Sequence, residues 1–258
     1  MTSDDAPDAV YRLDLAYDGR AYFGWQRHGD KPTLQGTLED AISACFGVHN
    51  AVHGSGRTDR GVHANGQVAS VRLPVELELE PGAALGALRR ELPDDIQLLA
   101  LTRAASADFH ARTSAKAKTY RYVIWNAPEC PEQEQGRVWH IPGQLDVAAM
   151  RPACAVFVGR HDFASFAKKT NFEQASTVRN IHSVDLLHDP STPERIEIVF
   201  RADGFLWKMV RNIVRAIVKV GEGRTPAAQL TQILVARDRS AAPGTAPASG
   251  LYLDNVEY

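Results

Sequence analysis

The sequence is poor in the residues that build disulfide frameworks and metal sites. Three cysteines occur in the 258 residues, at Cys45, Cys130 and Cys154, with no C-x-x-C pair. An odd, widely spaced set argues against a disulfide framework and against a structural zinc site. His49 and His53 are four residues apart, with His63 further along, but no adjacent cysteine or carboxylate completes an obvious ligand set. We therefore expect free thiols and no bound metal.

Long apolar runs and the common nucleotide motifs are also missing. No stretch is long and apolar enough to cross a bilayer. Residues 1–8 are polar and acidic, without the basic start and apolar core of a signal peptide, so we expect a cytoplasmic protein that does not bind membranes. The chain has no G-x-x-x-x-G-K-[ST] and no G-x-S-x-G. These absences argue against a P-loop nucleotide site and against a serine-hydrolase elbow.

The alternation of residue types predicts a mixed α+β protein. Apolar residues alternate with polar ones over Tyr11–Tyr17, which is typical of a strand, and follow helical spacing over Leu34–Cys45, ahead of Gly47. Further strands are predicted at 67–73, 96–101, 119–125, 181–187 and 196–200, and helices at 81–91, 150–158, 206–220 and from 226 onward.

This order predicts two similar lobes, residues 1–105 and 106–258. Each lobe is expected to be a mixed, mostly antiparallel sheet with helices on one face, and the active site is expected in a cleft between them.

Charge is balanced overall but unevenly distributed. The chain carries 29 Lys and Arg against 31 Asp and Glu. In the predicted helix 206–220, Lys208, Arg211, Arg215 and Lys219 lie opposite the apolar stripe, with no acid among them until Glu222. Such a face favours contact with phosphates, although a solvated helix surface has the same pattern.

The densest candidate for chemistry is the loop at residues 54–64, which is rich in glycine and holds Arg57 and Asp59. Gly54-Ser55-Gly56 is similar to the start of a dinucleotide fingerprint, but Asp59 stands where its third glycine would be. Glycine permits tight backbone turns and the close approach of a ligand. Taken alone, the loop could still be an ordinary turn.

Several motifs in order give this loop a more specific meaning. Residues 56–64, GRTDRGVHA, resemble the signature of the TruA family of tRNA pseudouridine synthases, and the resemblance extends over almost the whole chain. The other matching segments are 18–19, 23–26, 33–39, 118–122, 163–166, 209–214 and 246–253.

The resemblance implies an isomerase that needs no cofactor. Such enzymes break the uridine N1–C1′ bond, turn the base over and rejoin it through C5. The implied substrate is tRNA, at uridines 38, 39 and 40 of the anticodon stem-loop, and the implied assembly is a homodimer.

The resemblance also assigns roles residue by residue. Asp59 matches the catalytic carboxylate, which either attacks C1′ or removes a proton from C2′ to give a glycal. Tyr120 matches the active-site tyrosine that stacks on the base, and Arg211 matches an arginine that pairs with the aspartate. Leu251 would lie under the base. Other residues expected to bind substrate are Arg57, Thr58, Arg60, His63, Lys208 and Arg215.

One departure and three alternatives remain open. Position 60 is more often small in the family, so Arg60 bears on substrate range. The chain could also be an RNA-binding module without catalysis, a pseudouridine synthase acting on another RNA, or a metal-dependent hydrolase. Pseudouridine formation in tRNA, its map in cellular RNA, and inhibition by chelators would separate these alternatives.

Overall fold

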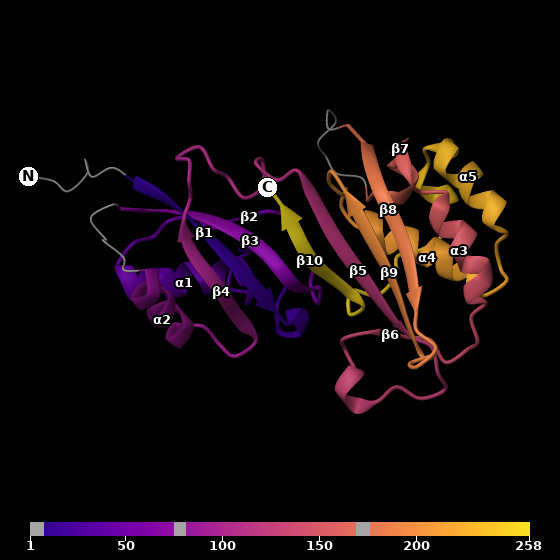
Figure 1. Ribbon diagram of the computed structural model, residues 1–258, viewed down its shortest axis with the longest axis horizontal. Coiled ribbons are helices and arrows are strands. Elements are labelled where there is room, and N and C mark those ends of the chain that lie inside the picture. The colour runs from indigo at the N-terminus through magenta and orange to yellow at the C-terminus, as the bar shows by residue number, and fades with distance from the viewer. Residues whose placement is uncertain (1–7, 75–80, 169–175) are drawn as a thin grey trace, which may run out of the picture. The chain divides into compact units, whose positions relative to one another are not determined.

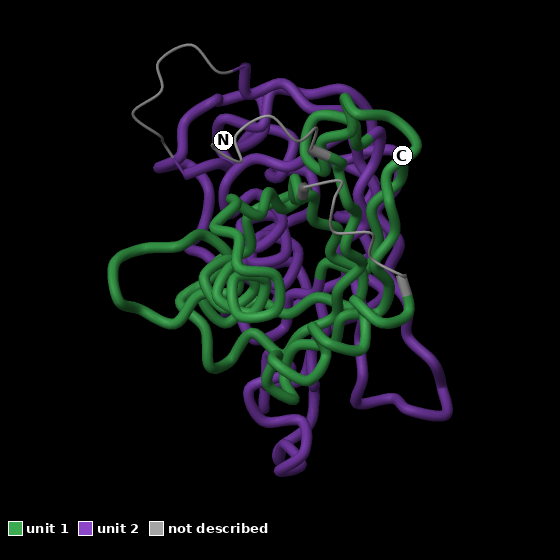
Figure 2. Tube along the Cα trace, turned by 90° about the vertical axis from the view of Figure 1, so that its left-hand side faces the viewer, with its two compact units in different colours: residues 1–115, 253–258 green, residues 116–252 purple. Residues whose placement is uncertain are grey.

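The computed structural model describes residues 8–74, 81–168 and 176–258. The chain divides into two compact units, unit 1 comprising Met1–Ala115 and Leu253–Tyr258, and unit 2 comprising Lys116–Tyr252 (Figure 2). The predicted boundary after residue 105 therefore falls ten residues short of the observed one, and the C-terminal segment returns to unit 1.

Unit 1 is built on an antiparallel sheet in which β1 (Asp8–Tyr17) lies between β3 (His63–Pro74) and β4 (Ile96–Arg103) (Figure 1). The short strand β2 (His53–Gly54) pairs with β3. The alternation predicted over Tyr11–Tyr17 is confirmed, because Tyr11, Leu13, Leu15 and Tyr17 are all buried. The helices are α1 (Leu34–Phe46) and α2 (Pro81–Glu91).

The last strand, β10 (Leu251–Glu257), neighbours β3, and the alternation pattern did not predict it. Asn65 Nδ2 of β3 donates to Asp254 Oδ1 at 2.7 Å. Gly66 permits this approach, because a Cβ there would lie 2.2 Å from the Asp254 carbonyl oxygen. The run Leu251–Glu257 is interrupted by Asp254 and Asn255, which weakens its strand signal.

In unit 2 the strands pair in the order β5-β9-β8-β7, and these pairs are antiparallel. These strands are β5 (Ala117–Trp125), β7 (Gly159–Asp162), β8 (Val178–His188) and β9 (Arg195–Ala202). The two-residue strand β6 (Trp139–His140) pairs in parallel with β5. Tyr122, Val123 and Ile124 in the middle of β5 are fully buried.

Three helices complete unit 2: α3 (Val147–Ala155), α4 (Met209–Gly221) and α5 (Ala227–Ala236). Helix α3 packs on β8, α4 and α5, and the three helices are grouped together in Figure 1. Short 3-10 turns occur at Gly19–Ala21, Glu132–Glu134, Ala164–Phe166 and Arg239–Ala241. The α+β class is thus confirmed.

Two helix starts differ from the prediction for local reasons. Helix α3 begins three residues early because the Asp146 side chain accepts a hydrogen bond from Ala149 N and caps it. Helix α4 begins at Met209 because Lys208 has a left-handed backbone, with φ of 62°. A side-chain cap at α3 and a left-handed backbone residue at α4 therefore set these boundaries, beyond what apolar spacing specifies.

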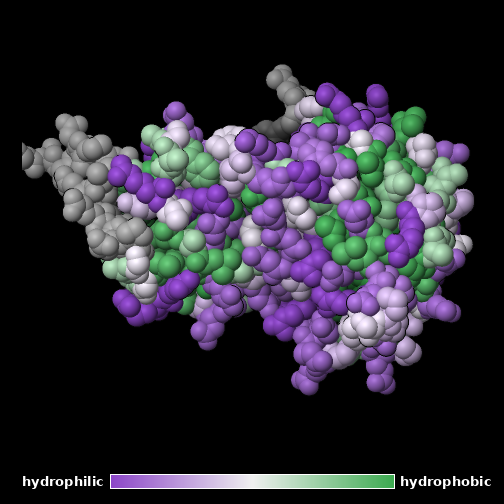
Figure 3. Space-filling model, in the orientation of Figure 1, coloured by the Kyte–Doolittle hydropathy of each residue, from purple (hydrophilic) through white to green (hydrophobic). Residues whose placement is uncertain are grey.

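Most large apolar side chains are buried, and hydrophilic residues dominate much of the surface seen in Figure 3. Hydrophobic surface is visible in Figure 3 over the part of unit 2 that holds β8 and α3. Leu187 and Val158 are among the exposed large apolar residues of unit 2. Among the described residues, no helix has both the length and the apolar character needed to cross a membrane.

Candidate functional site

The Asp59 loop connects β2 to β3 in unit 1, and backbone hydrogen bonds fix it at both ends. Ser55 N donates to Val68 O at 2.7 Å, and Val62 N donates to Asp59 O at 3.1 Å. Trp25 N donates to Thr58 O at 3.0 Å, which joins the loop to the segment before α1. Asp59 is half-buried, so its side chain stays accessible while its backbone is held.

A series of hydrogen bonds between buried polar side chains supports the loop on its interior side. Gln67 Nε2 donates to Gly56 O at 2.9 Å and to the Tyr17 hydroxyl at 3.3 Å. The Tyr17 hydroxyl then lies 2.9 Å from Thr58 Oγ1. Burial raises the pKa of Tyr17 to about 12, so the phenol keeps its proton at neutral pH, and either hydroxyl can be the donor in the bond with Thr58. Thr58 is therefore a support for the loop, with its side chain turned away from solvent.

His63 is also an interior residue, with only 2% of its surface exposed. Its Nδ1 lies 3.2 Å from Gly19 N and also 3.2 Å from Asp18 Oδ1. A backbone N–H can only donate, so Nδ1 accepts from Gly19 N when the ring is neutral, whereas a protonated ring would pair with Asp18. His63 therefore anchors the turn after β1, and its role in substrate binding stays a prediction.

Glycines let the backbone of residues 19–24 lie against the loop. Gly24 has φ of +94°, and a Cβ there would lie 2.7 Å from Thr58 O. A Cβ on Gly19 would lie 2.0 Å from Val62 O. Both contacts leave no room for a side chain, which explains glycine at these two positions.

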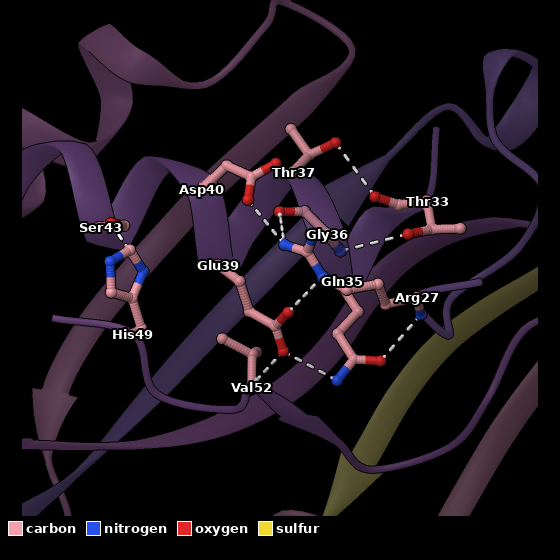
Figure 4. Close-up of polar contacts among 10 residues, drawn as sticks. All are labelled: Arg27, Thr33, Gln35, Gly36, Thr37, Glu39, Asp40, Ser43, His49 and Val52. Carbon is pink, nitrogen blue, oxygen red and sulfur yellow. Dashed lines mark hydrogen bonds and ion pairs between the residues drawn. The ribbon is translucent and has the colours of Figure 1, made fainter. Parts of the chain in front are cut away.

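Helix α1 clamps the segment that braces the loop (Figure 4). Thr33 Oγ1 accepts from Gly36 N at 3.2 Å and caps the helix. The Arg27 guanidinium binds Glu39 at 2.7 Å and Asp40 at 2.6 Å, and it also donates to Gly36 O. Arg27 N donates to Gln35 Oε1 at 3.0 Å, so both the backbone and the side chain of Arg27 are tied to α1.

In unit 2 three of the matching motifs meet around Arg211 of α4. Arg211 Nε donates to Ala246 O at 2.8 Å, and Ala246 N donates to Arg211 O at 3.2 Å. The same segment is tied to β5, because the Tyr122 hydroxyl donates to Pro247 O at 2.8 Å and Val123 N donates to Gly250 O at 2.8 Å. Segments 118–122, 209–214 and 246–253 therefore form one structural cluster.

Tyr120 and Leu251 also belong to unit 2 and are mostly buried, with 8% and 7% of their surfaces exposed. The Tyr120 ring meets the Phe205 ring edge to face, with centroids 5.1 Å apart. Phe205 was not singled out from the sequence, because it is a single apolar residue just before a predicted helix. This contact packs Phe205 against the Tyr120 ring.

The C-terminal half of the basic face predicted for helix 206–220 is partly offset by a single carboxylate, Glu222. Glu222 lies 3.6 Å from Arg215, 2.8 Å from Lys219 and 3.4 Å from Arg224. These cations hold the pKa of the Glu222 carboxyl below its usual range against the opposing effect of burial. The sequence placed Glu222 outside the stripe, but the C-terminal turn of α4 folds it back onto the cations.

Within the described ranges, no group of three or more His, Cys, Asp or Glu side chains is arranged to hold a metal ion. The neighbouring histidines pair with other groups. His53 stacks on His110 with centroids 5.1 Å apart, and His49 Nδ1 lies 3.0 Å from Ser43 Oγ.

The support beneath the loop gives a stability prediction. Tyr17→Phe removes the hydroxyl that links Thr58 and Gln67, and it leaves buried polar atoms without that partner. We expect the free energy of unfolding to fall by about 1–3 kcal/mol, measured by urea denaturation. Tyr11→Phe, on the same strand, is the control. In the part of the chain that the structure describes, the Tyr11 hydroxyl has no hydrogen-bond partner, so its loss should cost under about 0.5 kcal/mol. Equal losses for both variants would contradict the supporting role.

Comparisons with known proteins agree with the motif pattern. A family model described as "tRNA pseudouridine synthase" matches residues 15–114 and 153–258. The tRNA pseudouridine synthase A of Methylacidiphilum infernorum is 41% identical over 251 residues, covering 96% of this chain and 95% of that one. The protein of the same name from Rhodospirillum rubrum is 43% identical, covering 96% and 87%. That from Solidesulfovibrio magneticus is 43% identical over 256 residues, covering 97% and 91%.

Proposed function

Because the chain belongs to the tRNA pseudouridine synthase family, we propose that it converts uridine to pseudouridine at positions 38, 39 and 40 of the tRNA anticodon stem-loop. The support is the near-complete coverage of relatives that share one name, together with a braced loop that holds the matching carboxylate. We further propose that it works as a homodimer in the cytoplasm, as the family resemblance implies.

Asp59 is the proposed catalytic carboxylate. Breaking the N1–C1′ bond develops positive charge at C1′, which an adjacent carboxylate stabilises or captures. After rotation of the base, the C5–C1′ bond forms, the proton on C5 is lost and N1 gains a proton. The fixed backbone of residues 55–62 supports this role, because it fixes the point from which the carboxylate projects.

Tyr120, Arg211 and Leu251 are proposed to act on the same nucleotide. The target base must leave its stack, and an aromatic ring is the usual platform for an extruded base. In this arrangement the Tyr120 hydroxyl lies near uridine C5 and helps to take the proton from that carbon. Leu251 forms the apolar surface under the base. Arg211 keeps Asp59 ionised by its positive charge. The shared hydrogen bonds of segment 246–251 with Arg211 and β5 support a common role.

Contacts to the RNA backbone are proposed for Arg57, Arg60, Lys208 and Arg215. Arg57 and Arg60 are exposed beside Asp59. Lys208 stands at the N-terminus of α4, where the helix dipole also favours an anion. Arg215 is the weakest of the four, because Glu222 already offsets its charge.

Release of tritium from tRNA labelled at uridine C5 tests the proposed reaction. The C5 proton is lost only when the new bond forms at that carbon, so the purified chain should release tritium in proportion to pseudouridine formed. Tight tRNA binding without tritium release would instead identify an RNA-binding module.

The reaction is also expected to proceed without a metal cofactor. An isomerisation at carbon and nitrogen has no redox step, and the carboxylate supplies the nucleophile or base. Turnover on pre-folded tRNA should therefore be unchanged by EDTA, once magnesium needed by the RNA itself is replaced with spermidine. A loss of activity that only zinc or magnesium bound to the protein restores would favour the metal-dependent alternative.

A further inference from the structure

Phe23 is an exposed aromatic ring with two cations against it, at the edge of unit 1. Its side chain is 40% exposed. The Arg60 guanidinium carbon lies 4.2 Å from the ring centroid, and the Lys31 amine nitrogen lies 5.1 Å from it. Both distances are within the range of a cation–π interaction. We refer to Phe23, Lys31 and Arg60 as the Phe23 cluster.

The backbone places the Phe23 cluster directly beside Asp59. Gly24 follows Phe23, and a Cβ at Gly24 would lie 3.1 Å from Arg60 N and 3.2 Å from the Asp59 carbonyl carbon. Phe23 N is bound to Pro32 O at 2.8 Å, which brings the turn that holds Lys31 onto the same side. The two cations thus come from different segments and meet over one ring.

The charges of the cluster are not balanced by acids. Across residues 8–74, 81–168 and 176–258, no carboxylate lies within ion-pairing distance of Lys31, Arg57 or Arg60. Neighbouring arginines differ in this respect, because Arg20 pairs with Asp18 at 2.8 Å and Arg27 pairs with Glu39 at 2.7 Å. The two cations lie close enough to one ring that salt screens their mutual repulsion only partly. An anion bound between them would therefore stabilise their arrangement.

We propose that the Phe23 cluster binds a backbone phosphate of the RNA substrate next to the target uridine. In this arrangement Arg60 and Lys31 contact the phosphate, and Phe23 is a positioning residue that orients the guanidinium of Arg60. A guanidinium stacked on a ring still presents the N–H groups on its edge, which suit a phosphate. The proposal rests on the proposed function, since it takes the target uridine to be at Asp59.

Salt dependence of tRNA binding measures the phosphate contact. For single-stranded RNA each phosphate contact contributes about 0.7 to the slope of log K against log salt. We expect Arg60→Ala and Lys31→Ala each to make the slope shallower by about 0.7 and to weaken binding at low salt. If both variants keep the wild-type slope, the proposal is overturned. That result is also the one expected if the cluster binds another protein.

Arg12→Ala is a matched control from the same unit. The Arg12 guanidinium also stacks on a ring, that of Tyr258, with 5.0 Å to the centroid, but it pairs with Asp14 at 2.6 Å. Its replacement should leave the slope unchanged. A slope that falls as much in Arg12→Ala as in Arg60→Ala would show a general charge effect and overturn the assignment of this site.

A double-mutant cycle tests the positioning role of Phe23. Phe23→Leu keeps an apolar side chain but removes the ring, and we expect tRNA binding about two- to fivefold weaker, the size of an exposed cation–π contact. In the Arg60→Ala background the same change should have no further effect on binding. Full additivity of the two losses would mean that Phe23 does not act through Arg60.

These results separate the cluster from the proposed function. If the wild type forms pseudouridine and the slopes do not change, only the cluster is wrong. If the slopes change as expected but tritium is never released, the cluster binds RNA and the catalytic proposal fails.

Discussion

Asp59→Ala and Asp59→Asn should abolish pseudouridine formation, with a loss of at least about a thousandfold in the single-turnover rate. The carboxylate is the only part of Asp59 that can stabilise or capture the charge at C1′, and an amide is neither a nucleophile nor a base at neutral pH. The asparagine variant is the sharper of the two because it preserves the shape of the side chain.

Both variants should fold. Residue 59 is tied into the loop through its carbonyl oxygen, which accepts from Val62 N, and this bond survives the substitutions. Circular dichroism and tRNA affinity close to that of the wild type would establish this. Asp94→Ala, which removes an exposed acid ahead of β4, is the control for loss of charge and should keep full activity. Substantial turnover by Asp59→Asn would remove Asp59 from the mechanism.

Arg211→Ala should lower the single-turnover rate at saturating enzyme by about a hundredfold or more, the usual effect of deleting a preorganised charged donor. The Arg211 side chain is half-buried and fixed by its bond to Ala246 O, so it is not a mobile surface charge. Arg211→Lys keeps the charge but loses the planar fork, and its rate should fall between those of the wild type and Arg211→Ala.

The single-turnover rate at saturating enzyme separates an effect on the chemical step from an effect on tRNA binding. A residue that only contacts phosphate would alter tRNA affinity and its salt dependence, whereas saturating enzyme removes that effect from the observed rate. Arg224→Ala is a suitable control, since Arg224 is an exposed cation just after the same helix and pairs with Glu222. A wild-type single-turnover rate in Arg211→Ala would reduce Arg211 to a docking residue.

Local sequence patterns predicted the secondary structure well where apolar residues recur at the spacing of a strand or a helix. Strand β1 and helix α1 follow directly from the spacing of their apolar residues and from Gly47, which has a left-handed backbone with φ of 69°. Strand β10 and the start of α4 were missed, because one depends on pairing with a strand distant in sequence and the other on a left-handed lysine. Neither feature leaves a periodic signal.

The site residues stay predictions from the motifs, and the structure around them was not predictable for a similar reason. The motif singled out Asp59 as the candidate carboxylate, but it could not show that Thr58 and His63 are turned inward, since their partners Tyr17 and Gly19 lie about forty residues away in sequence. The pairing of Glu222 with Arg215 and Lys219 depends on how the end of α4 turns back. Phe23 was recognised only as part of a motif, and its contact with Arg60 is a tertiary one.

The measurement that tests the central claim most directly is a nucleotide-resolution map of pseudouridine in unmodified tRNA after incubation with the purified chain. The account predicts new pseudouridine at positions 38, 39 and 40 with the wild type and none with Asp59→Asn. Pseudouridine confined to other positions would contradict the proposed substrate site. A map without any new pseudouridine, on tRNA that the protein demonstrably binds, would contradict the account as a whole.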